Sequence, residues 1–184
     1  MSRKTIETKY LELIAANLEM VTAEINDLSR LQKLLNAKIS NNWPPPLNDE
    51  ESMSYFKKFI EENPDGLGWG MWYFIRIQPD ESGRMAVGNG GFKGIPSEDG
   101  IVEIGYSILP EFQKKGYATE AVNGLLKWAF LHPQINRVIA ETLPELHPSI
   151  RVMEKNGFVF VGEGVEKGVI RYELSREHFE KTKI

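Results

Sequence analysis

The feature that most constrains this chain is a strand, a glycine turn and a helix in direct succession. Residues 102–110 alternate as a strand, residues 113–118 read Gln-Lys-Lys-Gly-Tyr-Ala, and residues 119–131 have the apolar spacing of a helix. A helix start leaves its first backbone N–H groups unpaired and carries roughly half a positive charge, so a tight turn there directs several donors at one anion. Gly116 lets the backbone approach that anion, and Ala118 keeps the first helical turn thin. The loop is therefore predicted to bind a diphosphate.

The same loop resembles a known family signature. Residues 113–118 are similar to the acetyl-CoA pyrophosphate motif of the GNAT N-acetyltransferase superfamily, which is Gln or Arg, two residues, Gly, one residue, then Gly or Ala. The strand at 102–110 and the helix start at Thr119 resemble the family's elements on either side of this motif. Residues 149–158, ending in Glu-Lys-Asn-Gly-Phe, resemble a later helix of the family. The three blocks, in order over residues 101–174, are most similar to the branch that includes the ribosomal-protein N-terminal acetyltransferases.

The resemblance implies an α/β (α+β) GNAT fold, with a mixed twisted sheet and helices on both faces. Its central strands would splay apart around acetyl-CoA, the cosubstrate. The pantetheine arm would lie between strands 101–109 and 137–143 and meet backbone groups at the end of the first. The cofactor-binding residues implied in this way are Ile108, Leu109, Gln113, Lys114, Lys115, Gly116, Tyr117, Ala118 and Thr119.

Length and charge limit the alternatives. A chain of 184 residues is long enough for one well-buried core, so we expect a single domain over residues 1–184. The formal net charge of −4 disfavours direct binding of nucleic acid and mildly favours basic acceptors. The chain contains no cysteine, which excludes transfer through an acyl-thiol enzyme. The acetyl group would therefore pass directly to the acceptor in a ternary complex.

Membrane and metal chemistry are not expected. No stretch approaches the roughly 18 apolar residues of a membrane span, so we expect a cytoplasmic protein without membrane contact. The three histidines lie far apart and have no acidic residue at metal-ligand spacing, which predicts that no metal is bound. These histidines are His132, His147 and His178.

Periodicity and turn residues predict the order of the elements. A proline run at residues 43–46 predicts a stiff extended connector, and residues 79–83 predict a turn. Residues 101–143 read as a strand, a helix and a second strand. We expect the two strands to be parallel and their connection to be right-handed. The expected strands are 5–14, 69–77, 84–92, 101–109, 137–143, 158–161 and 169–174, and the expected helices are 26–38, 49–62, 119–131 and 147–156.

Glu103 is the candidate general base. Period two places Glu103, Gly105, Ser107 and Leu109 on one face of the central strand, where a carboxylate needs either a partner or access to solvent. Glu103 would take a proton from the acceptor amine, or it would serve only as a solvated or ion-paired side chain. Glu141 on the neighbouring strand is the competing candidate.

The second half of the site departs from the family pattern. Leu146 stands where related chains commonly carry an asparagine, and Met153 stands where many carry a tyrosine that protonates the leaving thiolate. Ser149 is the remaining candidate for that acid, although a serine in a first helical turn is often only a cap. A CoA thiolate can also leave without a dedicated acid.

These observations predict an acetyl-CoA-dependent N-acetyltransferase that acts on a primary amine, either a protein N-terminus or a small amine. The alternative is a catalytically weak CoA-binding sensor or protein-interaction module on the same fold. The proline connector is the expected place for acceptor specificity, and Trp43, Trp69 and Trp72 either wall the acceptor side or belong to the core. The sequence leaves a monomer and a homodimer equally open.

Overall fold

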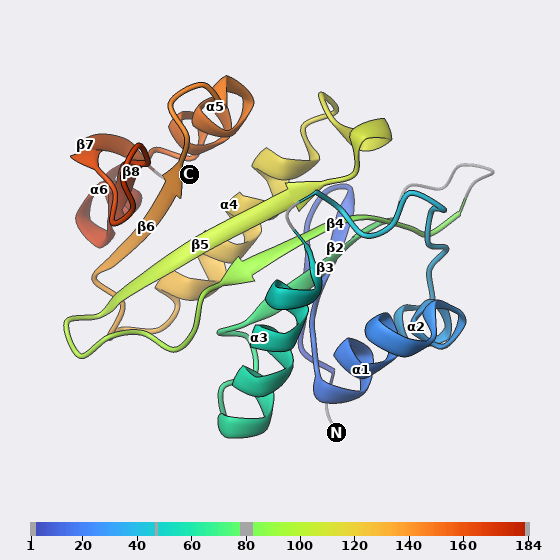
Figure 1. The fold of residues 1–184 in the computed structure, drawn as a ribbon. Helices are drawn as coiled ribbons and strands as arrows, with labels where there is room; N and C mark the ends of the chain where they lie inside the picture. Colours follow the sequence, from blue (N-terminus) through green and yellow to red (C-terminus); the bar gives the residue numbers. More distant parts are fainter. Residues whose placement is uncertain (1–2, 47, 78–82, 183–184) are drawn as a thin grey trace.

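The structure is a computed structural model that describes residues 3–46, 48–77 and 83–182. Its strands form one mixed sheet of eight strands in the order β1-β2-β3-β4-β5-β6-β8-β7 (Figure 1). The strands are β1 Thr5–Glu7, β2 Leu11–Ala15, β3 Met71–Arg76, β4 Met85–Phe92, β5 Ile101–Ile108, β6 Arg137–Thr142, β7 Val159–Glu163 and β8 Ile170–Ser175. The helices are α1 Leu18–Asn26, α2 Leu28–Leu35, α3 Glu50–Glu62, α4 Tyr117–Phe130, α5 His147–Lys155 and α6 Arg176–Thr182, with a short 3₁₀ turn at Pro110–Phe112.

The first part of the chain differs from the expectation. The single strand expected at 5–14 is wrong, because Thr8 turns the chain and β1 and β2 form an antiparallel hairpin. The helix expected at 26–38 is shorter, since Asp27 caps α2 and Asn36 ends it in the left-handed region at φ 50°. The expectation also missed α1, which begins after Asn17 accepts a hydrogen bond from the Met20 N–H. The structure therefore has α2 inside the range of the expected helix and one additional helix, α1, before it.

The middle of the chain follows the expectation closely. Asp49 caps α3 by accepting from the Ser52 N–H at 2.9 Å, and α3 ends at the predicted residue. The strands β3, β4 and β5 form the predicted antiparallel meander, with β3 buried along its whole length. Apart from Gly83, the turn predicted at 79–83 lies outside the described residues.

The last part confirms the predicted crossover. The strands β5 and β6 are parallel and are joined through α4, and α5 then leads to the predicted hairpin of β7 and β8. The short helix α6 was not expected. The mixed sheet, with helices on both of its faces, is the fold class that the sequence predicted (Figure 1).

Two hydrophobic cores lie on the two faces of the sheet. The core on the α4 face contains Trp69 and Trp72, and both pack against the partly buried ring of Trp128. The core on the other face, beneath α1, α2 and α3, contains Trp43, which packs against Tyr73. Trp69 and Trp72 are thus core residues on the α4 face, and among these three tryptophans Trp43 alone reaches the face covered by α1, α2 and α3.

Candidate functional site

The central strand β5 loses its neighbour on one edge partway along its length. Its parallel pairing with β6 runs from Ile101 opposite Arg137 to Glu103 opposite Ile139. The two strands then diverge, and α4 begins near the open end of this divergence (Figure 1). Residues 104–108 therefore have an edge that β6 does not pair with.

Backbone bonding on the opposite edge shows which groups face the divergence. The Lys93 N–H donates to the Glu103 carbonyl and the Leu109 N–H donates to the Val87 carbonyl, each at 2.9 Å. Backbone groups alternate between the two edges of an antiparallel strand. The groups that face the divergence therefore belong to Ile104, Tyr106 and Ile108.

Leu109 has both of its backbone groups engaged. Besides its N–H bond to Val87, its carbonyl accepts from the Phe112 N–H at 2.9 Å. The Leu109 N–H is therefore used, whereas its carbonyl keeps a second lone pair for the expected contact with a pantetheine arm. Ile108, in contrast, faces the free edge, where its carbonyl accepts from the Gln113 side chain at 3.0 Å.

The glycine loop has the backbone that its sequence requires. Lys114 and Gly116 are both left-handed, with φ 60° and φ 87°, and a side chain at Gly116 would meet no atom within 4 Å. The space beside Gly116 is therefore open, as an anion site there needs. Lys114 and Lys115 are exposed at its rim, and the Lys115 ammonium lies 5.2 Å from the centre of the Phe112 ring.

The helix α4 begins directly after this glycine. Its first intrahelical bond joins the Glu120 N–H to the Gly116 carbonyl at 3.0 Å, so the N–H groups of Tyr117, Ala118 and Thr119 have no acceptor within the helix. These donors point out of the helix start toward the loop. The Thr119 carbonyl accepts from the side chain of buried Asn156 at 3.2 Å, which ties the start of α4 to the end of α5.

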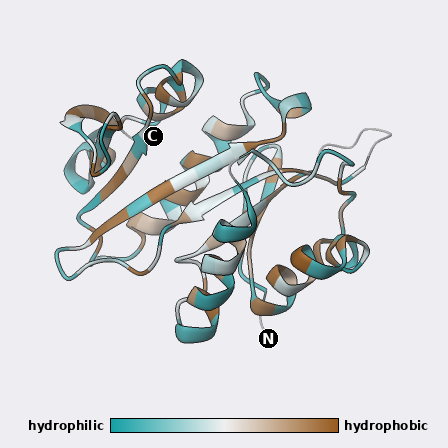
Figure 2. Ribbon diagram, viewed as in Figure 1, coloured by the Kyte–Doolittle hydropathy of each residue, from teal (hydrophilic) through white to brown (hydrophobic). Residues whose placement is uncertain are grey.

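Glu103 stands at the point where β5 and β6 separate. Its side chain is 23% exposed and forms an ion pair with the Lys93 ammonium. As predicted, it shares a face with Gly105 and Ser107, which is the face covered by α1, α2 and α3. Figure 2 shows pale stretches on neighbouring β4 and β5, where glycine and polar residues interrupt the hydrophobic strands. The Glu103 carboxylate is thus partly exposed, and its partner is a long lysine side chain that is itself mostly exposed.

Glu141 has a different environment although it is on the next strand. Both Nε and Nη2 of Arg171 donate to its Oε1, at 2.9 and 2.7 Å, and the Val165 N–H donates to the same oxygen at 3.1 Å. Its side chain is 11% exposed. This two-pronged guanidinium contact holds the carboxylate in a fixed structural role.

Ser149 contacts Tyr106 on β5, whose side chain packs against the core on the α4 face. The Tyr106 hydroxyl lies 3.0 Å from the Ser149 carbonyl and 3.2 Å from its Oγ. Burial raises the pKa of Tyr106 to about 12, against a smaller opposite effect of the bond to Ser149, so this hydroxyl keeps its proton at neutral pH. Met153, which is buried in the core, and Leu146, which is exposed at the start of α5, have no acidic hydrogen and cannot donate a proton.

The acceptor-side helices carry a second polar cluster. Glu24 on α1 accepts from the Tyr73 hydroxyl at 2.6 Å, from Trp43 Nε1 at 2.8 Å and from Asn48 Nδ2 at 2.9 Å. Burial raises the pKa of Glu24, and the three donors oppose that rise. The cluster borders a pocket of about 670 Å³, whose other lining residues are Ile25, Leu28, Pro44, Asp49, Glu50, Met53 and Ser54.

The connector before α3 is attached to the cofactor loop. Glu111 in the 3₁₀ turn accepts from the Ser40 hydroxyl at 2.6 Å and from Asn42 Nδ2 at 3.1 Å. These hydrogen bonds, the one from Ser40 first, lower the pKa of Glu111. These bonds join residues directly before the predicted proline connector to a residue between Leu109 and Gln113, so they link the neighbourhoods of the two predicted segments.

Sequence reasoning missed two side chains at this site. Lys93 gave no signal, because a lysine at a strand end is usually a solvated residue. Asn89 did give one, since it is a polar residue within a glycine-rich strand; it is buried and lies opposite Ser107 on β5. Within the described residues no cluster of three or more His, Cys, Asp or Glu side chains could hold a metal, and no helix there is long and apolar enough to cross a membrane.

Comparison with known proteins agrees with this geometry. The family model described as "Acetyltransferase (GNAT) domain" matches residues 17–159. The chain belongs to the GNAT acetyltransferase family and is an acetyl-CoA-dependent acyltransferase. It is 27% identical over 163 residues to the uncharacterized N-acetyltransferase YjdG of Bacillus subtilis, an alignment that covers 88% of this chain and 93% of that relative.

Solved structures share the fold. A GNAT-family acetyltransferase from Bacillus anthracis superposes with a TM-score of 0.60 at 25% identity, over 95% of this chain and 99% of that one. RimL, a ribosomal L7/L12 α-N-protein acetyltransferase in complex with coenzyme A, superposes with a TM-score of 0.65 at 21% identity, over 94% and 98% of the two chains. At that identity, the second likeness concerns the fold alone.

Proposed function

We propose that this acetyltransferase moves the acetyl group directly from acetyl-CoA to a primary amine, which is a protein N-terminus or a small amine. The observation that carries the proposal is the position of Glu103. It is a partly exposed carboxylate at the point where β5 and β6 separate, on a strand that leads into the glycine loop. The net charge of −4 also favours a cationic acceptor.

The cosubstrate lies along the free edge of β5. Its diphosphate meets the N–H groups at the start of α4, beside Gly116, with Lys114 and Lys115 at the rim. Its pantetheine arm follows the edge that Tyr106 and Ile108 present and runs toward the closed end of the divergence. The thioester then ends near Glu103.

Glu103 removes the proton that a protonated amine must lose before it attacks. An α-amine of pKa about 8 is roughly one-tenth neutral at pH 7, which costs about 1.4 kcal/mol, whereas a lysine-type amine near 10.4 costs about 4.6 kcal/mol. One carboxylate, acting directly or through water, is sufficient for an α-amine. The Lys93 ammonium has to move aside when the acceptor approaches Glu103, and its flexible side chain permits this.

The leaving thiolate requires little help. A thiol has a reference pKa of about 8.5, so the thiolate is a good leaving group near neutral pH. Ser149 passes its hydroxyl proton to the thiolate as it regains one from solvent, and its hydroxyl is oriented by Tyr106. This arrangement takes over the role for which Met153 is unsuited.

The acceptor approaches from the face covered by α1, α2 and α3, because Glu103, Gly105 and Ser107 point to that face. We also propose that residues 1–184 act as one cytoplasmic domain that needs no metal, as a monomer or a homodimer. The continuous eight-stranded sheet, with a core on each face, supports one domain.

Amine-dependent release of CoA tests the proposal. Because the chain contains no cysteine, a thiol reagent reports only the released CoA. The substrates are peptides with a free N-terminus, the same peptides with a blocked N-terminus and an internal lysine, polyamines and amino sugars. Release with at least one class of amine is expected. Stabilisation of the fold by acetyl-CoA without release for any amine would instead support the CoA-binding sensor.

A further inference from the structure

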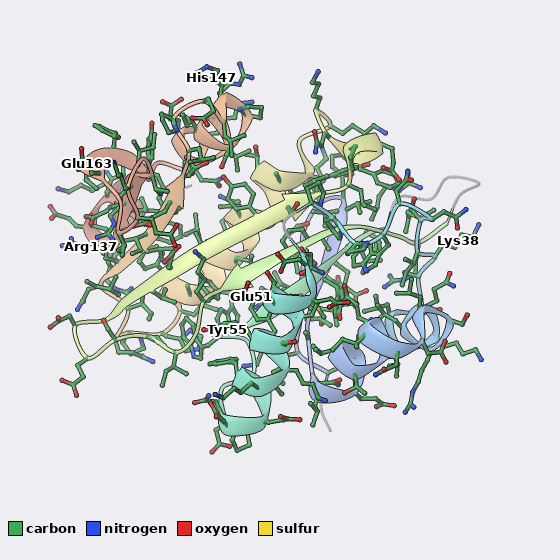
Figure 3. All side chains as sticks on the ribbon, viewed as in Figure 1. Lys38, Glu51, Tyr55, Arg137, His147 and Glu163 are labelled. Atoms are coloured by element: carbon green, nitrogen blue, oxygen red, sulfur yellow. The ribbon has the colours of Figure 1, made fainter. Side chains whose placement is uncertain are left out.

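Lys93 has an unusual location for a strand-end lysine. It directly follows β4, and its N–H donates to the Glu103 carbonyl at 2.9 Å. Its carbonyl accepts from the Tyr55 hydroxyl at 3.1 Å, and Figure 3 shows Tyr55 extending from α3 toward the loop after β4. Two elements, β5 and α3, therefore fix the backbone of Lys93.

The side chain of Lys93 passes over Gly105 on β5, and its ammonium lies at Glu103, the candidate base. A β-carbon built on Gly105 would lie 4.0 Å from Lys93 Cε, and the Lys93 ammonium pairs with Glu103 Oε1. This side chain is nonetheless 57% exposed. Lys93 is thus an accessible primary amine that is held at the carboxylate at the closed end of the β5–β6 divergence.

The Lys93 amine occupies the position that the acceptor amine takes in the proposed reaction. In the proposed function, on which this inference rests, the acceptor is a primary amine that gives its proton to Glu103 beside the thioester. The Lys93 amine meets both requirements without leaving its own chain. Its high local concentration would favour the reaction when no external amine is present.

We propose that Lys93 is a self-acetylation site of this enzyme. The Lys93 ammonium loses one proton to Glu103 or to water, and the neutral Nζ attacks the thioester carbonyl of bound acetyl-CoA. The new N–C bond replaces the C–S bond, the nitrogen loses its second proton, and the CoA thiolate takes up one proton. The products are free CoA and Nε-acetyl-Lys93, which carries no charge.

The modification changes the site itself. Acetyl-Lys93 cannot pair with the Glu103 carboxylate as a cation, so the base loses the internal ammonium that competes with an acceptor. The reaction occurs once per chain, because the product amide is not a nucleophile. It would therefore mark chains that have met acetyl-CoA in the absence of an amine substrate.

Peptide mapping by mass spectrometry tests this proposal. The intact chain is incubated with acetyl-CoA and no acceptor, and acetylation is followed at Lys93 and at Lys181. Lys181 is a matched comparison, since it is an exposed lysine that pairs with Glu177 on α6, away from β5. We expect Lys93 to be acetylated at least tenfold faster than Lys181, at a rate independent of protein concentration.

Three further arms separate enzymatic from chemical acetylation. Excess CoA without an acetyl group should suppress the reaction at Lys93, because it occupies the same site. Glu103→Gln should slow it at least tenfold, and Lys93→Arg should abolish the modification at that position. If Glu103→Gln does not fold, the CoA arm and the comparison with Lys181 still decide. Equal acetylation of Lys93 and Lys181, unaffected by excess CoA, would overturn the proposal.

Failure of this inference is distinguishable from failure of the proposed function. An unmodified Lys93 in a chain that releases CoA with external amines would overturn self-acetylation and leave the proposed function intact. A chain that acetyl-CoA does not stabilise, and that releases no CoA with any amine, would overturn both.

Discussion

The proposed cofactor side and the proposed acceptor side of this molecule are built in opposite ways. The cofactor side is contiguous in sequence, from the free-edge backbone of Ile108 through Gly116 to the first turn of α4. The acceptor side is assembled from distant residues, such as Glu24 and Tyr73, which are 49 positions apart and bond at 2.6 Å. The two sides meet where Glu111 accepts from Ser40 and Asn42.

This difference indicates which of the two sides can change its specificity through substitutions of side chains. A diphosphate is bound by backbone N–H groups, so the cofactor side depends on one local conformation more than on particular side chains. The acceptor side depends on side chains that three separate segments bring together. If the proposed function holds, substitution in α1 or the proline connector would therefore alter the acceptor pocket and leave the cosubstrate site intact.

The largest effect is expected at the point where the two sides share Glu103. Glu103→Gln should lower turnover by roughly 10²-fold or more with acetyl-CoA affinity nearly unchanged, the usual scale of general-base catalysis. Raising the pH should partly rescue the variant, because hydroxide then supplies neutral amine, and rescue should come at lower pH for an α-amine than for a lysine-type amine. Steady-state rates as a function of pH measure both effects.

A matched control for this variant is Glu173→Gln. Glu173 is 21% exposed and pairs with Arg137 at 2.8 Å, so it resembles Glu103 in exposure and in having a basic partner. We expect its turnover to stay within about twofold of the parent chain. Unchanged turnover in Glu103→Gln, together with a loss in Glu141→Gln, would assign the base to β6 instead.

The second effect breaks the cofactor side alone. Acetyl-CoA at a hundred times its Kd should add about 2.7 kcal/mol to the free energy of unfolding. Gly116→Asp should remove most of that gain, because it puts a negative side chain in the open space beside the loop at a left-handed position, φ 87°. Thermal unfolding with and without acetyl-CoA measures the gain.

Gly168 supplies the control for backbone strain. It also has open space around it and φ 86°, but it lies between β7 and β8. Gly168→Asp should cost similar stability in the absence of ligand and keep the full response to acetyl-CoA. Equal responses of the two variants would mean that the diphosphate binds elsewhere.

The third largest effect is expected from a substitution that disrupts only the proposed acceptor side. Glu24→Ala should lower the free energy of unfolding by about 2 kcal/mol, because it leaves buried donors without an acceptor. Glu19→Ala on the same helix is the control, since Glu19 is exposed and its pair with Arg30 should contribute about 0.5 kcal/mol or less. Urea unfolding measures both, and acetyl-CoA should stabilise both variants as it does the parent.

The pH dependence of stability sharpens this prediction. Because burial raises the pKa of Glu24, the native state holds its proton more tightly than the unfolded state. That contribution to stability is complete at pH below the ordinary carboxyl range and is lost as the pH rises through the raised pKa. Glu24→Gln should remove this loss and flatten the curve. An identical slope in the parent and the variant would contradict the assignment.

The smallest effect is expected at Ser149. Ser149→Ala should lower turnover by less than about tenfold, since a thiolate with a reference pKa near 8.5 leaves readily. Ser175→Ala provides the control, because Ser175 accepts from the His178 N–H at the start of α6, away from the site. A loss of about 10² or more in Ser149→Ala would make proton donation to the thiolate a dominant step.

The local sequence pattern was sufficient to predict those elements whose conformation depends on residues a few positions apart. The meander, the glycine loop, α3 and the β5–α4–β6 crossover were predicted, because period-two alternation, caps and glycine turns act over a few residues. The hairpin of β1 and β2 was missed, since its turn at Thr8 uses a side-chain bond to Leu11 and contains neither glycine nor proline. The Asn17 cap of α1 was a readable signal that was overlooked.

The sequence by itself determined that a carboxylate would stand on the same face of β5 as Gly105 and Ser107, and a second one on β6. It could not determine which basic side chain each carboxylate would meet, because those partners lie elsewhere in the chain. Sheet register decided that, by placing the flexible Lys93 at Glu103 and the two-pronged Arg171 at Glu141. Lys93 directly follows β4, and Arg171 lies on β8. Each basic side chain is far from its carboxylate in the sequence, and only the pairing of neighbouring strands brings the two charges together.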